Sequence, residues 1–293
     1  MKELSPFRSI KGRLSSIYAE ERALFYVGLL GILLGIIGII VMAVHGRFIP
    51  PEGHIYKAAS FDIAIGIYIL TIILFIPLAG FSMRGRKLWR WTSVALALYA
   101  YVVENIQIYR GLDPRFTRHG TAVDNIVGAL FGATALGLIA TFLILTWRFF
   151  SKRSGVKDRL LLLGVRYGCA SVILAFLTGF WLGANQGPKI GAAGNLLPLH
   201  AAGFHGLQAV PLVALLLGWA GVRAENARRW VHLAGLAWLG LCAAIAWQTA
   251  LGQSMLELSA ATLLACALLL GWLACALMAS VAWRRAGVVP YST

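Results

Sequence analysis

The sequence predicts an all-α, polytopic membrane protein with eight transmembrane helices, arranged as a 4+4 tandem repeat of four-helix bundles. The chain is 59% hydrophobic and only 13% charged, whereas a soluble domain has about 25% charged residues. Its long apolar runs are close to the ~20 residues that a helix needs to cross the bilayer. These runs lack the alternation of barrel strands, and helices satisfy their own backbone groups in lipid.

Eight apolar runs are the predicted spans, and they lie at 24–44, 61–80, 89–109, 122–147, 161–182, 200–221, 231–251 and 260–282. The predicted domains are a cytoplasmic N-terminal segment 1–23, four-helix units at 24–150 and 151–286, and a cytoplasmic tail 287–293. The N-terminal segment is polar up to the first apolar run, which is not typical of a secretory signal peptide. We therefore expect the first run to be a true span.

The basic residues fall mainly on one side of the predicted spans. That side holds the positive clusters of the N-terminus, the even-numbered connections and the C-terminus, whereas the other side holds only Arg47, Lys57, Arg110, Arg115, Arg118 and Lys189. Because Lys and Arg collect on cytoplasmic loops, both termini are predicted to be cytoplasmic in a cell (bacterial inner) membrane. The net charge of +15 then requires no nucleic acid, and anionic lipid headgroups are the predicted neighbours. The sequence identifies no protein partner.

The two halves of the chain align without a gap when they are shifted by 141 residues. This shift pairs Trp89 with Trp230 and Gln107 with Gln248, and it also pairs Gly111 with Gly252 and Thr121 with Thr262. Each unit has an even number of spans, so a duplication would relate the units by an axis along the membrane normal. The alternative is eight similar helices without shared ancestry.

Polar residues of the spans gather at the predicted outer face. Five of the six histidines and most of the acidic and amide residues of the spans lie there, and only His232 lies on the cytoplasmic side. Polar groups inside a membrane are costly and usually mark function. The pattern predicts a pocket that opens to the extracytoplasmic side, and it gives little support to a polar route across the membrane.

Glu104 is the strongest single candidate. It lies ~8 Å inside the predicted end of its helix, and it shares a face with Tyr101 and Gln107 by i, i+3 spacing. A carboxyl group there binds a ligand, pairs with a cation, or makes a structural hydrogen bond to a neighbouring helix. For Asp124 and Asp62 the alternative to a ligand role is capping of their own helices.

His200 and His205 are separated by ~140° around a helix, so they do not form the i, i+4 pair of zinc helices. We expect His205 and Gln208 to face the bundle interior and His200 to lie at its mouth, with plain interfacial histidines as the alternative. Imidazole and carboxylate suit iron, zinc or copper. The predicted catalytic residues are Glu104 and His205. The predicted metal ligands are His205, His200 and Glu104, and the predicted cofactor-binding residues are His200, His205, Gln208, Asn105 and Asp124.

The segment His200-x-x-Gly203-x-His205-x-x-Gln208-x-x-Pro211 resembles a segment of a family of uncharacterised bacterial multi-pass membrane proteins. That resemblance covers about a dozen residues and implies no activity. In its architecture of eight spans, parallel repeat and cytoplasmic termini, the chain also resembles haem A synthase. That family presents paired histidines on the even-numbered helices of each half, whereas the second, fourth and eighth predicted spans here contain none.

Three functional hypotheses follow. The first is a pocket for a ligand, a transition metal or haem near the extracytoplasmic face, in a membrane redox enzyme or a binding protein. The same residues could pass a proton to a quinone-like or lipid substrate. The second is a transporter of a small solute, and the third is a non-catalytic subunit of an envelope or respiratory complex.

Overall fold

A computed structural model describes residues 15–151, 155–156 and 158–286. Within them the chain forms two compact units, one that ends at Gly155 and one that begins at Val156, and we call them the N-terminal and C-terminal units. The predicted tail 287–293 and most of the predicted segment 1–23 lie outside the described residues.

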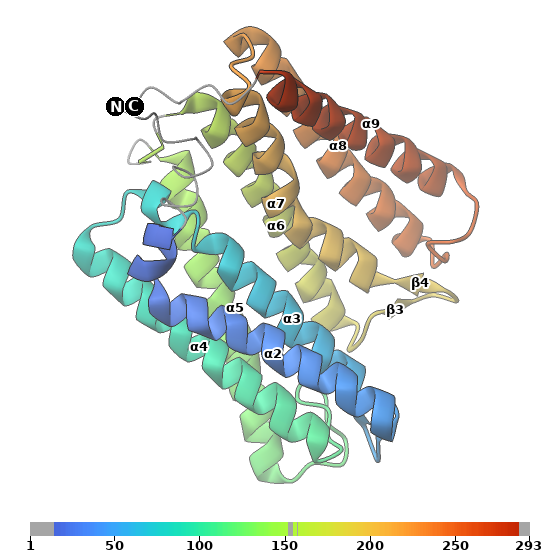
Figure 1. Cartoon of the computed structure of the whole chain (residues 1–293). Helices are drawn as coiled ribbons and strands as arrows, with labels where there is room; N and C mark the ends of the chain where they lie inside the picture. Colours follow the sequence, from blue (N-terminus) through green and yellow to red (C-terminus); the bar gives the residue numbers. More distant parts are fainter. Residues whose placement is uncertain (1–14, 152–154, 157, 287–293) are drawn as a thin grey trace. The chain divides into compact units, whose positions relative to one another are not determined.

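The N-terminal unit contains a short β-hairpin between its first two long helices (Figure 1). Its elements are α2 (Arg22–His45), β1 (Phe48–Ile49), β2 (Gly53–His54), α3 (Ile55–Ile72), the 3-10 turn η1 (Ile76–Ala79), α4 (Met83–Tyr109) and α5 (Ala122–Phe150). The C-terminal unit follows the same order. Its elements are α6 (Arg159–Ala184), β3 (Lys189–Ile190), β4 (Gly194–Asn195), α7 (Leu196–Trp219), α8 (Ala224–Ala250) and α9 (Ala260–Arg285).

The all-α class and the multi-pass character are confirmed. Among the described residues, seven helices are long and apolar enough to cross a membrane, and α4 is not one of them. The first turns of α4 carry Arg84, Arg86, Lys87 and Arg90, which lower its hydropathy. The predicted second span, 61–80, is displaced, because α3 already begins at Ile55, directly after the hairpin, and ends at Ile72. Lys57 and Ser60 therefore lie inside this helix.

The two hairpins were not predicted from the sequence, and their registers correspond. Phe48 pairs with His54 in the first, and Lys189 pairs with Asn195 in the second, so equivalent positions are 141 residues apart. Each hairpin is held by the glycine that follows the third helix of its unit. The Glu52 N–H donates to the Gly111 carbonyl over 2.8 Å, and the Ala193 N–H donates to the Gly252 carbonyl over 2.8 Å.

Both of these glycines have a left-handed backbone, with φ of 79° at Gly111 and 70° at Gly252. They also touch the hairpin backbone, and a Cβ on Gly252 would lie 3.1 Å from the Gly191 Cα. Such positions favour glycine for both reasons. The contact places the hairpin, the end of the third helix and the start of the second helix together at one end of each unit, which we call the hairpin end.

The gapless pairing of the two halves fails at the last helix of each unit. Thr121 is the N-cap of α5, whereas the N-cap of α9 is Ser259, and Thr262 lies three residues further on. The loop before α9 is therefore shorter by three residues than the loop before α5.

Candidate functional site

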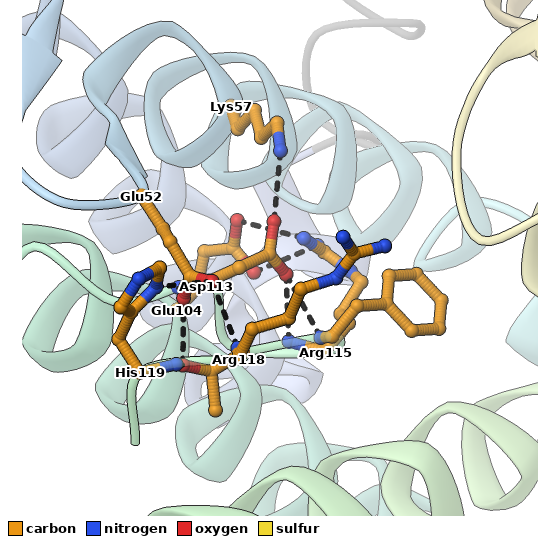
Figure 2. Close-up of polar contacts among 9 residues, drawn as sticks. Glu52, Lys57, Glu104, Asp113, Arg115, Arg118 and His119 are labelled. Atoms are coloured by element: carbon orange, nitrogen blue, oxygen red, sulfur yellow. Dashed lines mark hydrogen bonds and ion pairs between the residues drawn. The ribbon is translucent and has the colours of Figure 1, made fainter.

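The hairpin end of the N-terminal unit holds a set of charged side chains that we call the polar cluster, consisting of Glu52, Lys57, Glu104, Asp113, Arg115 and His119 (Figure 2). These side chains come from the hairpin, α3, α4 and the connection between α4 and α5. The cluster therefore links the hairpin and the start of α3 to the end of α4 and the connection that follows it.

Glu104 is completely buried, and Arg115 compensates its charge. The Arg115 Nη2 lies 2.7 Å from Glu104 Oε2, and its Nη1 donates to Oε1 over 3.2 Å. The guanidinium group also lies over the rings of Phe61 and Phe131, at 5.2 and 5.0 Å from their centroids. This ion pair between aromatic rings compensates the charge of the buried carboxylate, although Glu104 Oε2 has no hydrogen-bond partner among the described residues. The partner of Glu104 is thus a cation of the following connection.

Two further carboxylates fix the same connection. Asp113 Oδ2 accepts from Lys57 Nζ over 2.8 Å, and Asp113 Oδ1 accepts from the N–H groups of Arg115 and Phe116 over 2.9 and 3.1 Å. Burial raises the pKa of Asp113, but the hydrogen bond from Lys57 and these backbone donors outweigh it, so the pKa lies below its usual value. A turn follows Asp113, and the Asp113 side chain closes it.

Glu52 holds the remainder of this connection. It accepts from the Thr117 hydroxyl over 2.6 Å and from the Arg118 N–H over 2.8 Å, and its Oε1 lies 3.0 Å from the His119 Nδ1. Burial raises the pKa of Glu52, but these donors outweigh it and lower the pKa to about 2.

The lowered pKa of Glu52 predicts a pH dependence of stability. The carboxylate form contributes stability at pH values above 4.5, the ordinary pKa, and this contribution is lost as the pH falls towards about 2. We expect Glu52→Gln to lower the thermal unfolding temperature at neutral pH, and the difference from wild type to shrink between pH 4.5 and 2. Thermal unfolding in mild detergent at several pH values measures this. A difference that stays constant across that range would contradict the prediction.

Asp124 caps its own helix. It forms a capping box with Thr121 at the start of α5, it accepts from Arg110 Nη1 over 2.5 Å, and it accepts from Gln107 Nε2 over 3.1 Å. The capping interpretation is confirmed for this residue. Gln107 at the end of α4 thereby fixes the start of α5. Gln248 at the end of α8 likewise fixes the start of α9, because it accepts from the Ser259 hydroxyl over 2.5 Å.

Asp62 does not cap α3, because the N-cap of α3 is His54. It is instead completely buried in the helix, and its Oδ2 accepts from Asn105 Nδ2 of α4 over 2.8 Å. Two buried polar atoms nearby have no hydrogen-bond partner among the described residues, namely Asp62 Oδ1 and the Tyr101 hydroxyl. Both residues pack on Gly31 of α2, where a Cβ would collide with the Tyr101 hydroxyl and the Asp62 carbonyl oxygen.

Tyr101 and Asn105 also line a groove between α2 and α4 with a volume of about 300 Å³, together with Leu30, Leu34, Leu98, Val102 and Ile106. Leu30, Leu98, Val102 and Ile106 are exposed at the surface of the unit. The surface of the groove is therefore almost wholly apolar, and Tyr101 and Asn105 are its two lining residues with polar side-chain groups. Unpaired buried polar atoms are uncommon in proteins, because each costs about 1–3 kcal/mol.

In the C-terminal unit, the predicted histidines do not come together at an interior site. His200 Nδ1 lies 2.9 Å from the Ala175 carbonyl of α6, whereas His205 is exposed and Gln208 is partly buried. Gly203 packs directly on Ala175, so the face of α7 with His200 and Gly203 contacts α6. His205 is two residues from Gly203, or ~200° around the helix, and it points away from α6. The expectation that His205 faces the bundle interior is therefore wrong.

No group of three or more His, Cys, Asp or Glu side chains within the described residues is placed to hold a metal ion. Glu104 belongs to the N-terminal unit and pairs with Arg115, whereas His200 and His205 belong to the C-terminal unit. The metal or haem site made from these three residues stays a prediction, and the described geometry gives it no support.

Arg115, Lys57 and Glu52 were not predicted from the sequence to be members of a site. A signal was present, since a buried Glu104 needs a nearby cation and Arg115 is one of the few basic residues on its side. The fold and the site define a multi-pass membrane protein with a charged network at one end of its first unit. Comparison with protein-family models, with curated proteins and with solved structures gives no match.

Proposed function

We propose that this integral membrane protein binds a lipid-soluble molecule with a hydroxyl head group in the groove between α2 and α4. The observation that carries the proposal is the unsatisfied buried hydroxyl of Tyr101, which lines an apolar groove, together with the unsatisfied Oδ1 of Asp62, the hydrogen-bond partner of the lining residue Asn105. A ligand head group would satisfy them, and its apolar tail would lie along the exposed leucines. A quinol or a hydroxylated lipid has this chemistry, because its hydroxyl group can donate to Asp62 Oδ1 or pair with the Tyr101 hydroxyl.

The size and lining of the groove fit such a ligand. Its volume of about 300 Å³ is at the lower end of small-molecule sites, which are roughly 300–1,000 Å³ and mostly apolar with a few polar groups. The polar cluster would hold the ends of α3 and α4 rigid, because Lys57 and Glu104 both bond to the connection that follows α4. Asp62 and Asn105 on these two helices are thereby kept at a fixed spacing. The groove therefore supports an organic ligand, and a metal or haem is not needed for it.

We also propose that the chain has eight spans, namely the seven apolar helices and α4, and that both termini lie in the cytoplasm. Its Trp89 is buried and donates to the Thr141 carbonyl of α5 over 2.8 Å, so α4 packs along an apolar helix. The asymmetry of Lys and Arg supports the orientation, and it places the hairpin ends on the extracytoplasmic side.

An internal duplication is also part of the proposal. The equal hairpin registers support it, as do two pairs of left-handed glycines at the same offset, Gly80 with Gly221 and Gly111 with Gly252. A left-handed glycine is required by a particular local turn. Two such glycines at the same offset are therefore stronger support for a duplication than two matching leucines. The second unit has no counterpart of the polar cluster, since Glu104 and Asp113 correspond to Ile245 and Ser254.

If the groove binds a lipid-soluble molecule, the purified protein should carry it. A bulky side chain placed in the groove should displace this molecule. Protein purified in mild detergent would be extracted with organic solvent, and lipid-soluble molecules would be quantified by mass spectrometry. We expect a near-stoichiometric amphipathic molecule in wild type, and its loss in Leu34→Trp, because the indole ring fills the groove. Tyr101→Phe should reduce the bound amount roughly tenfold, because it removes the hydroxyl and so one hydrogen bond to the ligand.

Leu33→Trp is the matched control, since Leu33 is the neighbouring exposed residue of α2 and does not line the groove. It should keep the bound molecule. Equal amounts of every extracted molecule in the two tryptophan variants would refute the proposed function.

A further inference from the structure

A second cavity lies at the other end of the N-terminal unit, where α4 begins, and it is independent of the groove. It has a volume of about 610 Å³ and is lined by Glu20, Met83, Arg84, Arg86, Lys87 and Arg90. Because α4 has 27 residues, or a length of ~40 Å, this cavity is far from the polar cluster. Four cations and one carboxylate line it, so its charge is positive.

Two of these cations are held in place by ion pairs with the chain before α2. Glu21 is completely buried. Its Oε1 accepts from Arg86 Nε over 2.6 Å and from Arg90 Nη2 over 2.9 Å, and its Oε2 accepts from Arg90 Nε. Glu20 accepts from Arg86 Nη2 over 2.9 Å. The cavity is thus built before any ligand binds, and fixed guanidinium groups lose little entropy when they bind an anion.

The other two cations are exposed and available. Arg84 and Lys87 form no ion pair with any residue in the described part of the chain. The first turn of α4 contains no acidic residue, so the positive end of the helix dipole adds to the charge. The cavity therefore has unpaired positive charge, which attracts an anion.

Apolar side chains surround this basic site. Met83, Leu88 and Trp91 are 84%, 71% and 52% exposed, and they lie on the same turns of α4 as the cations. Basic residues beside exposed Leu and Trp are typical of the membrane interface. The inference rests here on the proposal that α4 is the eighth span. A helix of ~40 Å exceeds the ~30 Å hydrocarbon core, so the first turns of such a span extend into the headgroup region. The equivalent turns of α8 lack this pattern, since Arg86 and Arg90 correspond to Ala227 and Val231.

We infer that this cavity is a binding site for the phosphate headgroup of an anionic phospholipid. The phosphate lies between the fixed Arg86 and Arg90 and the exposed Arg84 and Lys87, and the acyl chains follow Leu88 and Trp91 into the bilayer. A free phosphate ion shares the headgroup chemistry, but it would leave the exposed apolar side chains without a partner.

Native mass spectrometry in non-ionic detergent tests this inference, with dioleoyl phosphatidylglycerol and dioleoyl phosphatidylcholine as the probes. Wild type should bind the first phosphatidylglycerol more tightly than phosphatidylcholine by at least roughly tenfold. Arg84→Gln combined with Lys87→Gln should remove most of this preference. Both residues are exposed and lie outside the ion pairs with Glu20 and Glu21, so this variant should fold normally.

Arg284→Gln combined with Arg285→Gln is the matched control, because it removes two exposed cations from the end of α9. This control should bind as wild type does. Equal binding of the two lipids by wild type, or an equal loss in both double variants, would overturn the inference. Full displacement of the lipid by millimolar inorganic phosphate would also overturn it, because the site would then recognise free phosphate.

Discussion

Replacement of Arg115 by alanine should strongly destabilise the N-terminal unit. The variant leaves Glu104 completely buried without the cation that lies 2.7 Å away. Loss of one partner of a buried ion pair costs about 3–5 kcal/mol, a large fraction of the stability of a typical domain. Thermal unfolding in mild detergent, followed by circular dichroism, should show a strongly lowered midpoint.

Arg118→Ala is the control for this experiment. Arg118 is in the same connection, but its contact with Glu52 is made by its backbone N–H, so the variant should keep nearly wild-type stability. Glu104→Gln in the Arg115→Ala background should restore part of the loss, because a neutral amide is cheaper to bury than an unpaired carboxylate. A midpoint for Arg115→Ala that matches that of Arg118→Ala would show that the ion pair contributes little.

The membrane class of this fold could be predicted because composition and the length of apolar runs report it directly. Hydropathy does not report local backbone geometry, and this is where the predictions failed. The hairpins were missed because Phe48–Ile49 and Gly53–His54 are too short to show alternation. The predicted second span began too late relative to α3, because the start of α3 is polar, with Lys57 and Asp62 inside the helix.

Two residues with buried polar contacts were singled out from the sequence, but their partners were not. Glu104 and Asn105 were identified, because polar residues in a span are conspicuous. Their partners Arg115 and Asp62 were assigned to a loop and to a helix cap, because the sequence does not show which loop residue folds back onto a helix. His205 was assigned to the interior because it is polar within an apolar run, whereas the packing of α7 is set by Gly203 and Gly206 against α6.

The second prediction with a large expected effect concerns the close packing of α2 against α3 at Gly31. In Gly31→Ala, the new Cβ would lie 2.7 Å from the Asp62 carbonyl oxygen, which belongs to helix backbone and cannot move away alone. We expect α2 and α3 to be pushed apart at a cost of about 1–3 kcal/mol. Gly132→Ala is the matched control, because no atom lies within 4 Å of a Cβ there. Its higher helix propensity should leave stability unchanged or raise it by up to about 1 kcal/mol.

Gly31 also connects the packing of the unit with the groove, because its Cβ would collide with the Tyr101 hydroxyl. Gly31→Ala should therefore lose the bound lipid-soluble molecule as well as stability. Gly203→Ala separates these two effects, since its Cβ would lie 2.8 Å from the Ala175 backbone nitrogen in the C-terminal unit. It should lower the unfolding midpoint and still retain the molecule in the organic extract. Loss of the molecule in both variants would mean that general destabilisation releases it, and Tyr101 would then have no specific part in binding.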